Sequence, residues 1–230
     1  MPRSDTKSKV IEVLSTIPAF ADLDALILDA LAQAATQRYY DAGRVVYLEG
    51  ELNSGVYIVQ EGWLKSVKIS AIGREQIFRF LGPGEVFNTA RIFTDGLNQT
   101  TVEALEPAKV WVIQSDTIIL LMDKYPSFGR VITQNLAEQV QHLMDLVENL
   151  SLLTVEARLA RTFLEHSTSD VLNRRRWSTQ AEMAARLGTV PDVLNRALRG
   201  LADEGLITIE RHQIYIRDRA GLQRKAMLGE

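Results

Sequence analysis

Residues 179–207 read TQAEMAARLGTVPDVLNRALRGLADEGLI, and this stretch decides the fold of the C-terminal part of the chain. Thr179–Glu182 is a capping box that begins a short helix, and Gly188 ends that helix. A second helix follows at once, with Thr189 as its expected N-cap and Pro191 in its first turn. Two helices joined by a glycine turn in this way predict a helix-turn-helix.

The second of these helices has two faces of different chemistry. Its apolar positions recur at helical spacing and are expected to pack inward: Leu194, Ala197, Leu198 and Leu201. The polar and cationic positions share the opposite face: Asp192, Asn195, Arg196 and Arg199. An exposed stripe of this kind suits a recognition helix in the major groove of DNA. There an arginine can donate two hydrogen bonds to guanine O6 and N7, and an aspartate can accept one from cytosine N4.

A hairpin is predicted after this helix. Gly205 ends the helix, and residues 206–209 and 214–216 alternate as two strands around a turn at Arg211. Such a hairpin would be the wing of a winged helix-turn-helix. Phosphate contacts, which give affinity without sequence information, are expected from Arg174, Arg175, Arg176, Arg199 and Arg211. The full set of expected DNA-binding residues is Thr179, Gln180, Thr189, Pro191, Asp192, Asn195, Arg196, Arg199 and Arg211.

Residues 39–113 have the pattern of an antiparallel β structure. Short β-branched and aromatic runs alternate with glycines, and eight of the 14 glycines fall between Gly43 and Gly96, where they can supply the positive φ of tight turns. The expected strands are 45–47, 56–59, 64–69, 77–81, 100–105 and 110–113. Strands at this spacing predict an antiparallel roll or jelly-roll barrel. Before them, residues 7–35 predict short amphipathic helices broken at Pro18.

A long helix is predicted after Pro126. Its apolar residues follow the 4-3-4-3 spacing of a coiled-coil seam: Leu136, Val140, Leu143, Val147 and Leu150. The remaining positions are nearly all polar, so this narrow stripe has little to bury against a core of its own. We therefore expect the helix to pair with its copy in a homodimer; the alternative is a helix packed on its own domain. Thr154 is then expected to cap an amphipathic helix that reaches His166, followed by a loop over residues 167–178.

Composition excludes several classes of protein. The 230 residues suit two modest domains, and 46% hydrophobic with 24% charged residues is an ordinary globular composition. No apolar run approaches the roughly 18 residues of a membrane span, and the polar N-terminus does not resemble a signal peptide, so a cytoplasmic location and no membrane partner are expected. The absence of cysteine excludes disulfides, iron–sulfur clusters held by thiolates and Cys-type zinc sites.

Charge is distributed unevenly along the chain. Residues 156–230 hold 13 Lys+Arg and 10 Asp+Glu, a net of +3. Since the whole chain has 26 and 29, residues 1–155 hold 13 and 19, a net of −6. A basic C-terminal half joined to an acidic N-terminal half indicates that the C-terminal part meets nucleic acid.

The chain resembles the CRP/FNR superfamily of bacterial transcription regulators, named for the cyclic-AMP receptor and the fumarate–nitrate regulator, over nearly its full length. The N-terminal motifs that carry the resemblance are Gly43, Gly50, Gly62–Lys65, Gly73–Glu75 and Leu81–Phe87. The C-terminal motifs are Arg158–Ala160, Leu187–Thr189, Arg196–Leu198 and Glu204–Ile207.

The resemblance implies an α+β fold in three parts: N-terminal helices and an antiparallel β-roll sensor similar to cyclic-nucleotide-binding domains in residues 1–125, a dimerisation α-helix and hinge in 126–153, and a winged helix-turn-helix DNA-binding domain in 154–230. It further implies that the protein is a homodimeric transcription regulator and not an enzyme. Its expected partners are a near-palindromic double-stranded operator and, for an activator, RNA polymerase.

Two departures limit what the resemblance implies. In cyclic-nucleotide-binding members, Gly-Glu follows the aromatic residue of the phosphate-binding cassette, and Arg-Ser or Arg-Thr comes about ten residues later. The Glu meets the ribose and the Arg meets the phosphate. The equivalents here are Asn88-Thr89 and Gln99-Thr100, and a neutral Gln cannot pair with a phosphate as Arg does. In the recognition helix, where members often show Arg-Glu-x-x-x-Arg or Glu-x-x-Ser-Arg, this chain has Pro191–Arg196, so no half-site preference is carried over.

We therefore expect no response to cyclic AMP, and a roll that senses an unknown effector or is effector-independent. When the long helix is aligned from Pro126 with that of the cyclic-AMP receptor, Leu143-Met144 occupies the place of the Thr-Ser pair that the receptor presents to adenine. The expected effector-pocket residues are Phe87, Asn88, Thr89, Ala90, Arg91, Gln99, Thr100, Leu143 and Met144.

Two alternatives come from other kinds of chemistry. A haem-based gas sensor of the same family would need an axial ligand, for which His142 or Met144 is available. A cupin-like β-barrel enzyme would need histidines on the barrel strands to hold a metal. The three histidines, His142, His166 and His212, all lie outside the predicted roll, so no metal site is expected.

Overall fold

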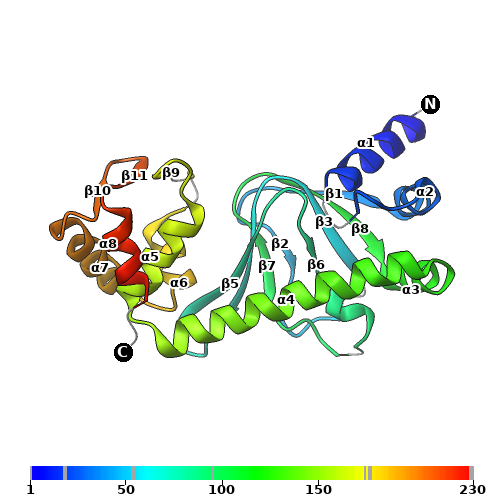
Figure 1. Ribbon diagram of the computed structural model, residues 1–230. Coiled ribbons are helices and arrows are strands. Elements are labelled where there is room, and N and C mark those ends of the chain that lie inside the picture. Colours follow the sequence, from blue (N-terminus) through cyan, green and yellow to red (C-terminus); the bar gives the residue numbers. More distant parts are fainter. Residues whose placement is uncertain are drawn as a thin grey trace. The chain divides into compact units, whose positions relative to one another are not determined.

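The computed structural model divides the chain into two compact units, residues 1–68 with 79–142 and residues 69–78 with 143–230 (Figure 1). The structure describes residues 2–17, 20–52, 55–94, 96–173, 175 and 178–227, and for residues 2–7 and 9 the backbone alone. None of the helices in these ranges is both long enough and apolar enough to cross a membrane.

In the N-terminal part, two helices precede the strands and two follow them. The strands form two four-stranded sheets, of order β1-β8-β3-β6 and β2-β7-β4-β5. The pairings β1–β8, β3–β8, β3–β6, β2–β7 and β4–β7 are antiparallel, as a roll requires. In chain order the elements are α1 Pro2–Thr16, α2 Ala25–Ala34, β1 Thr36–Tyr40, β2 Val45–Tyr47, β3 Gly55–Glu61, β4 Leu64–Ile69, β5 Glu75–Leu81, β6 Val86–Phe87, the 3-10 turn η1 Thr89–Ile92, β7 Thr101–Ala104, β8 Ala108–Gln114, α3 Ser115–Lys124 and α4 Pro126–Leu152.

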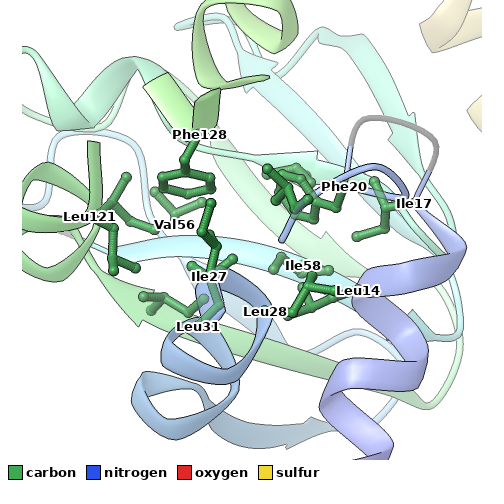
Figure 2. Packing of buried hydrophobic residues seen from close by; sticks show 14 of the residues in the cluster. Leu14, Ile17, Phe20, Ile27, Leu28, Leu31, Val56, Ile58, Leu121 and Phe128 are labelled. Carbon is green, nitrogen blue, oxygen red and sulfur yellow. The ribbon is translucent and has the colours of Figure 1, made fainter. Parts of the chain in front are cut away.

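A hydrophobic core lies between the N-terminal helices, the first sheet and the start of α4. The rings of Phe20 and Phe128 lie 6.3 Å apart, and Ile27 and Ile58 are buried in the same cluster (Figure 2). Burial of a side chain of this size is worth about 1.5–3 kcal/mol. The first turns of α4 are therefore fixed to the roll.

The C-terminal elements form a helical core with a small sheet of order β10-β11-β9. They are α5 Val155–His166, β9 Val171–Asn173, α6 Gln180–Arg186, α7 Pro191–Asp203, β10 Ile207–Ile209, β11 Gln213–Ile216 and α8 Arg219–Ala226. Fully buried Leu159, Phe163, Leu194, Leu201 and Leu222 come from α5, α7 and α8, so these three helices share one core.

The predicted α+β class is confirmed. The six strands predicted for the roll and the two predicted for the wing are present, with ends that differ by two residues or fewer. β1, β6, α3 and α8 were not predicted. The loop predicted over residues 167–178 is wrong in part, because β9 lies within it and pairs with β11. Pro18, the predicted helix break, and the arginines at 174 and 176 lie outside the described residues.

The N-cap predicted for the second helix of the helix-turn-helix is also wrong. The Thr189 amide donates to the Ala184 carbonyl oxygen at 2.9 Å, so this residue closes the preceding helix α6. Val190 is the N-cap of α7, with extended φ and ψ and no capping side-chain bond, and Pro191 takes the first helical position. A threonine next to a glycine turn fits either role locally, and only the course of the backbone decides between them.

Candidate nucleic-acid interface

The first helix of the helix-turn-helix, α6, begins as the capping box predicts. The Thr179 Oγ1 accepts a hydrogen bond from the Glu182 amide at 3.2 Å, which satisfies one of the free N–H groups of the first turn. Gly188, at φ +65°, makes the left-handed turn after α6. Thr179 and Gln180 are both exposed at the beginning of this helix.

The two faces predicted for α7 are present. Its buried face consists of Leu194, Ala197, Leu198 and Leu201. Asp192, Arg196 and Arg199 are exposed on the opposite face. Asn195 lies on the flank between them, half-buried, and its Nδ2 donates to Gln180 Oε1 at 3.2 Å. The polar stripe is therefore available to a partner such as DNA.

Contacts with α5 and α8 on the flank of α7 next to Arg196 hold this helix in place. A Cβ on Gly200 would lie 2.9 Å from a carboxylate oxygen of Glu156 at the start of α5, so a larger residue at this position would require the Glu156 side chain to shift. Lys225 of α8 pairs with Glu156 at 3.2 Å and with Glu204 at 2.7 Å. The hydrogen bond to Glu204 is the main cause that raises the pKa of Lys225, so this cation joins three helices at neutral pH.

A groove of about 490 Å³ opens beside these contacts. Its lining comes from the start of α5, from α7 and from α8: Thr154, Val155, Glu156, Val193, Arg196, Ala197 and Lys225. Arg196 therefore lies between the exposed stripe of α7 and the rim of this groove.

The wing is the hairpin of β10 and β11. Ile207, Ile214 and Ile216 are buried beneath it, as the alternating pattern predicts. Arg211 is exposed in the turn between the strands. Arg217, which was not among the predicted DNA-binding residues, is exposed after β11. Its Nε donates to Thr208 Oγ1 at 3.0 Å, and its guanidinium lies 5.1 Å from the centre of the Tyr215 ring. Its positive charge could have marked Arg217 as a candidate for DNA contact, but the prediction considered only the turn of the hairpin, and Arg217 comes after the second strand.

The cassette residues of the roll are bound to neighbouring protein groups. Asn88 has a left-handed φ of 67°, and its Nδ2 donates to the Gly55 carbonyl oxygen at 2.8 Å. Arg91 donates to Thr94 Oγ1 at 3.0 Å, and Ala90 is exposed beside it. Gln99 is exposed, and its amide donates to the Leu97 carbonyl oxygen at 3.2 Å. Thr100 accepts a hydrogen bond from Ser66 at 2.8 Å.

Thr89 belongs to a buried polar network that joins η1 to α4. Its Oγ1 donates to Asn135 Oδ1 at 3.0 Å, and Gln139 Nε2 donates to Thr89 Oγ1 and to Asn135 Oδ1, both at 2.7 Å. Thr89 is fully buried and Asn135 is 9% exposed. Because a buried polar group without a partner costs about 1–3 kcal/mol, these three side chains hold one another in place.

Aromatic rings fill the interior of the roll next to the cassette. Tyr57 stacks on Phe87 with ring centres 5.1 Å apart, and the Tyr47 ring lies 5.5 Å from the Tyr57 ring. Burial is the main cause that raises the pKa of Tyr47, and its hydroxyl hydrogen-bonds to Thr100. The space beside Thr100 is therefore occupied by the protein's own side chains.

Some residues of the expected seam of α4 are buried or half-buried, and the others are exposed in the single chain. Leu136 packs against the core of the roll, and Leu150 is half-buried. Val140, Leu143 and Val147 are 57%, 45% and 62% exposed in the single chain. Met144, the residue expected in the effector pocket beside Leu143, is 67% exposed, and both belong to the second unit whereas the cassette belongs to the first. Within the described residues, no group of three or more His, Asp or Glu side chains could hold a metal ion.

Two protein-family models match the chain, a cyclic nucleotide-binding domain over residues 37–125 and a Crp-like helix-turn-helix domain over residues 157–225. The CRP-like cAMP-activated global transcriptional regulator of Mycobacterium tuberculosis is 23% identical over 94% of this chain and 99% of that protein. An anaerobic regulatory protein of Haemophilus influenzae is 27% identical over 78% of this chain and 72% of that protein. The solved structure of FixK2 from Bradyrhizobium japonicum has a TM-score of 0.74 at 23% identity, over 85% of this chain and 99% of that one.

These similarities and the geometry of α6, α7 and the wing define a transcription regulator with a DNA-binding helix-turn-helix. The chain belongs to the CRP/FNR superfamily.

Proposed function

We propose that this protein regulates transcription in the cytoplasm as a homodimer that binds a near-palindromic operator. The exposed stripe of α7 carries the proposal, because Asp192, Arg196 and Arg199 offer hydrogen-bonding groups opposite a fully apolar buried face. Arg211 on the wing, and Thr179 and Gln180 at the beginning of α6, supply further polar groups for the DNA backbone. The proposed parts are the sensor in 1–125, the dimerisation helix and hinge in 126–153 and the DNA-binding domain in 154–230. If the protein is an activator, RNA polymerase is its further partner.

Selection from random double-stranded DNA tests this function. We expect the full-length protein to enrich a near-palindrome whose half-sites lie about 10 base pairs apart, because two recognition helices related by a two-fold axis must face the same side of the duplex. Affinity for the enriched site should fall steeply with salt, since each neutralised phosphate releases counterions. Enrichment of no sequence, with the protein folded by circular dichroism, would show that it is not a sequence-specific DNA binder.

We further propose that the roll does not respond to cyclic AMP. The positions that would meet ribose and phosphate are neutral, and their side chains are bound within the protein: Asn88, Thr89 and Gln99. The one cation of the cassette segment, Arg91, donates to Thr94. A ligand with a full negative charge would have to displace these bonds and gain no fixed cationic partner in return.

Cyclic AMP at millimolar concentration should therefore leave the melting temperature and the DNA affinity of this protein unchanged. Calorimetry and a thermal-shift assay provide the measurement. The Mycobacterium tuberculosis relative that is named cAMP-activated serves as the positive control in the same buffer. A micromolar dissociation constant for this chain would mean that another group replaces the missing phosphate partner.

A further inference from the structure

One hydrogen bond connects the two helices of the helix-turn-helix on their exposed side. Asn195 Nδ2 of α7 donates to Gln180 Oε1 of α6 at 3.2 Å. Gln180 is the exposed first residue of its helix, and Asn195 is half-buried on the flank of α7 that adjoins the exposed stripe. Both residues were expected to meet DNA, but no local pattern predicts a bond between them.

This bond determines which hydrogen-bonding groups each amide can still offer. A carboxamide has two N–H donors and one carbonyl acceptor. Gln180 has its carbonyl oxygen engaged, so it offers donors, which suit the phosphate oxygens of the backbone. Asn195 has one N–H engaged and keeps its other N–H together with its carbonyl oxygen. Asn195 therefore keeps one donor and one acceptor.

We propose that Asn195 reads an adenine in the major groove and that Gln180 is the positioning residue that orients the Asn195 amide. The inference rests on the proposed DNA-binding function and deepens it. Adenine presents an acceptor at N7 and a donor at N6, which complement the donor and acceptor that Asn195 retains. Guanine presents two acceptors, cytosine one donor, and thymine an acceptor and a methyl group, so none of them pairs with both groups of the amide.

The bond to Gln180 matters because a free asparagine amide rotates. Its terminal torsion is broad and roughly two-fold, so an unrestrained side chain spends only part of its time with the carbonyl oxygen and the N–H in the required order. An interaction that fixes this order before binding removes part of the ordering cost. Arg196 lies on the exposed face of α7 beside the groove, and Asn195 faces Gln180, so the contribution of Arg196 to base recognition is separate from that of Asn195.

Binding-site selection with matched variants tests the proposal. We expect Asn195→Ala to lower discrimination for adenine at one half-site position by roughly fivefold or more and to leave the other positions unchanged. Asn195→Asp keeps an acceptor but has no donor, so the preferred base at that position should change from adenine to cytosine. A residue with a purely structural role would produce neither change.

The positioning role of Gln180 is tested at the same base position. Gln180→Met removes the amide at similar size and should lower the preference for adenine there by severalfold, beyond any uniform loss from a missing phosphate contact. The double variant Gln180→Met/Asn195→Ala should discriminate no less than Asn195→Ala alone, because the first residue acts through the second. Gln223→Met, the same substitution at an exposed glutamine of α8, is the control and should change no base preference.

Each remaining outcome contradicts the proposal in a recognisable way. If Asn195→Ala changes no base preference while the wild-type protein selects an operator, Asn195 reads no base and the proposed DNA binding stands. If Gln180→Met weakens binding equally on all sequences, its role is limited to the backbone and the positioning role is wrong. A wild-type protein that enriches no sequence would overturn the proposed function and this inference together.

Discussion

The double variant Leu143→Asp/Val147→Asp is expected to be monomeric. These two residues are 45% and 62% exposed in the single chain, at positions where a second copy of α4 would cover them in a coiled-coil seam. Charges buried without partners cost several kcal/mol each, which is more than a short seam can offset. Size-exclusion chromatography with light scattering measures the change in mass.

The same variant should bind the full operator at least about 100-fold more weakly. In a dimer, binding of one subunit holds the other at a high effective concentration near the second half-site, and a monomer loses this gain in affinity. Its affinity for a single half-site should remain close to that of the wild type. Gln134→Asp/Gln141→Asp introduces the same charges at two exposed positions of α4 outside the seam and should remain a dimer. An intact dimer for the Leu143→Asp/Val147→Asp variant would show that the subunits associate through another surface.

The second large effect is expected from Arg196→Ala. Arg196 is exposed opposite the buried Leu194 and Leu198, where a guanidinium can reach a base edge in the major groove, and guanine is the base that arginine pairs with twice. Its removal should cost about 1–3 kcal/mol per half-site and relax specificity at one position. The melting temperature should change little, since the side chain is exposed.

Arg211→Ala is the matched control for Arg196→Ala. At the turn of the wing we expect phosphate contact alone, so this variant should weaken binding similarly on all sequences and lower the salt slope by about one unit. Binding-site selection and a salt titration with both variants separate the two roles. If Arg196→Ala keeps the wild-type base preferences and only binds more weakly, Arg196 is a backbone anchor and the groove assignment is wrong.

The side-chain bonds of the cassette segment are the basis of the proposal that the roll does not respond to cyclic AMP. Residues 37–125 match the cyclic nucleotide-binding domain model, and within them the Thr89 hydroxyl donates to Asn135 and accepts from Gln139. Tyr47 reaches Thr100 from inside the roll. A match to this domain model therefore does not by itself assign an effector to the chain.

Features that depend on local periodicity were determined by the sequence alone. The two faces of α7, the capping box at Thr179 and the alternation of Ile214 and Ile216 could be predicted, because the side-chain repeat of a helix or strand decides which positions share a buried face. The same holds for the narrow apolar stripe of α4, whose residues Val140 and Val147 are exposed in the single chain. These patterns were sufficient for the fold class and for the recognition helix.

Features that join segments far apart in the chain were decided by the tertiary structure. β9 has three residues and follows a turn in which Ser169 and Asp170 have positive φ without being glycines, so only its pairing with β11 makes it a strand. The bonds between Thr89 and Asn135, and between Asn195 and Gln180, are specified by no local pattern. A pattern within one segment indicates which of its faces is buried. Which other segment packs against that face depends on contacts between distant parts of the chain, and these form only when the whole core packs.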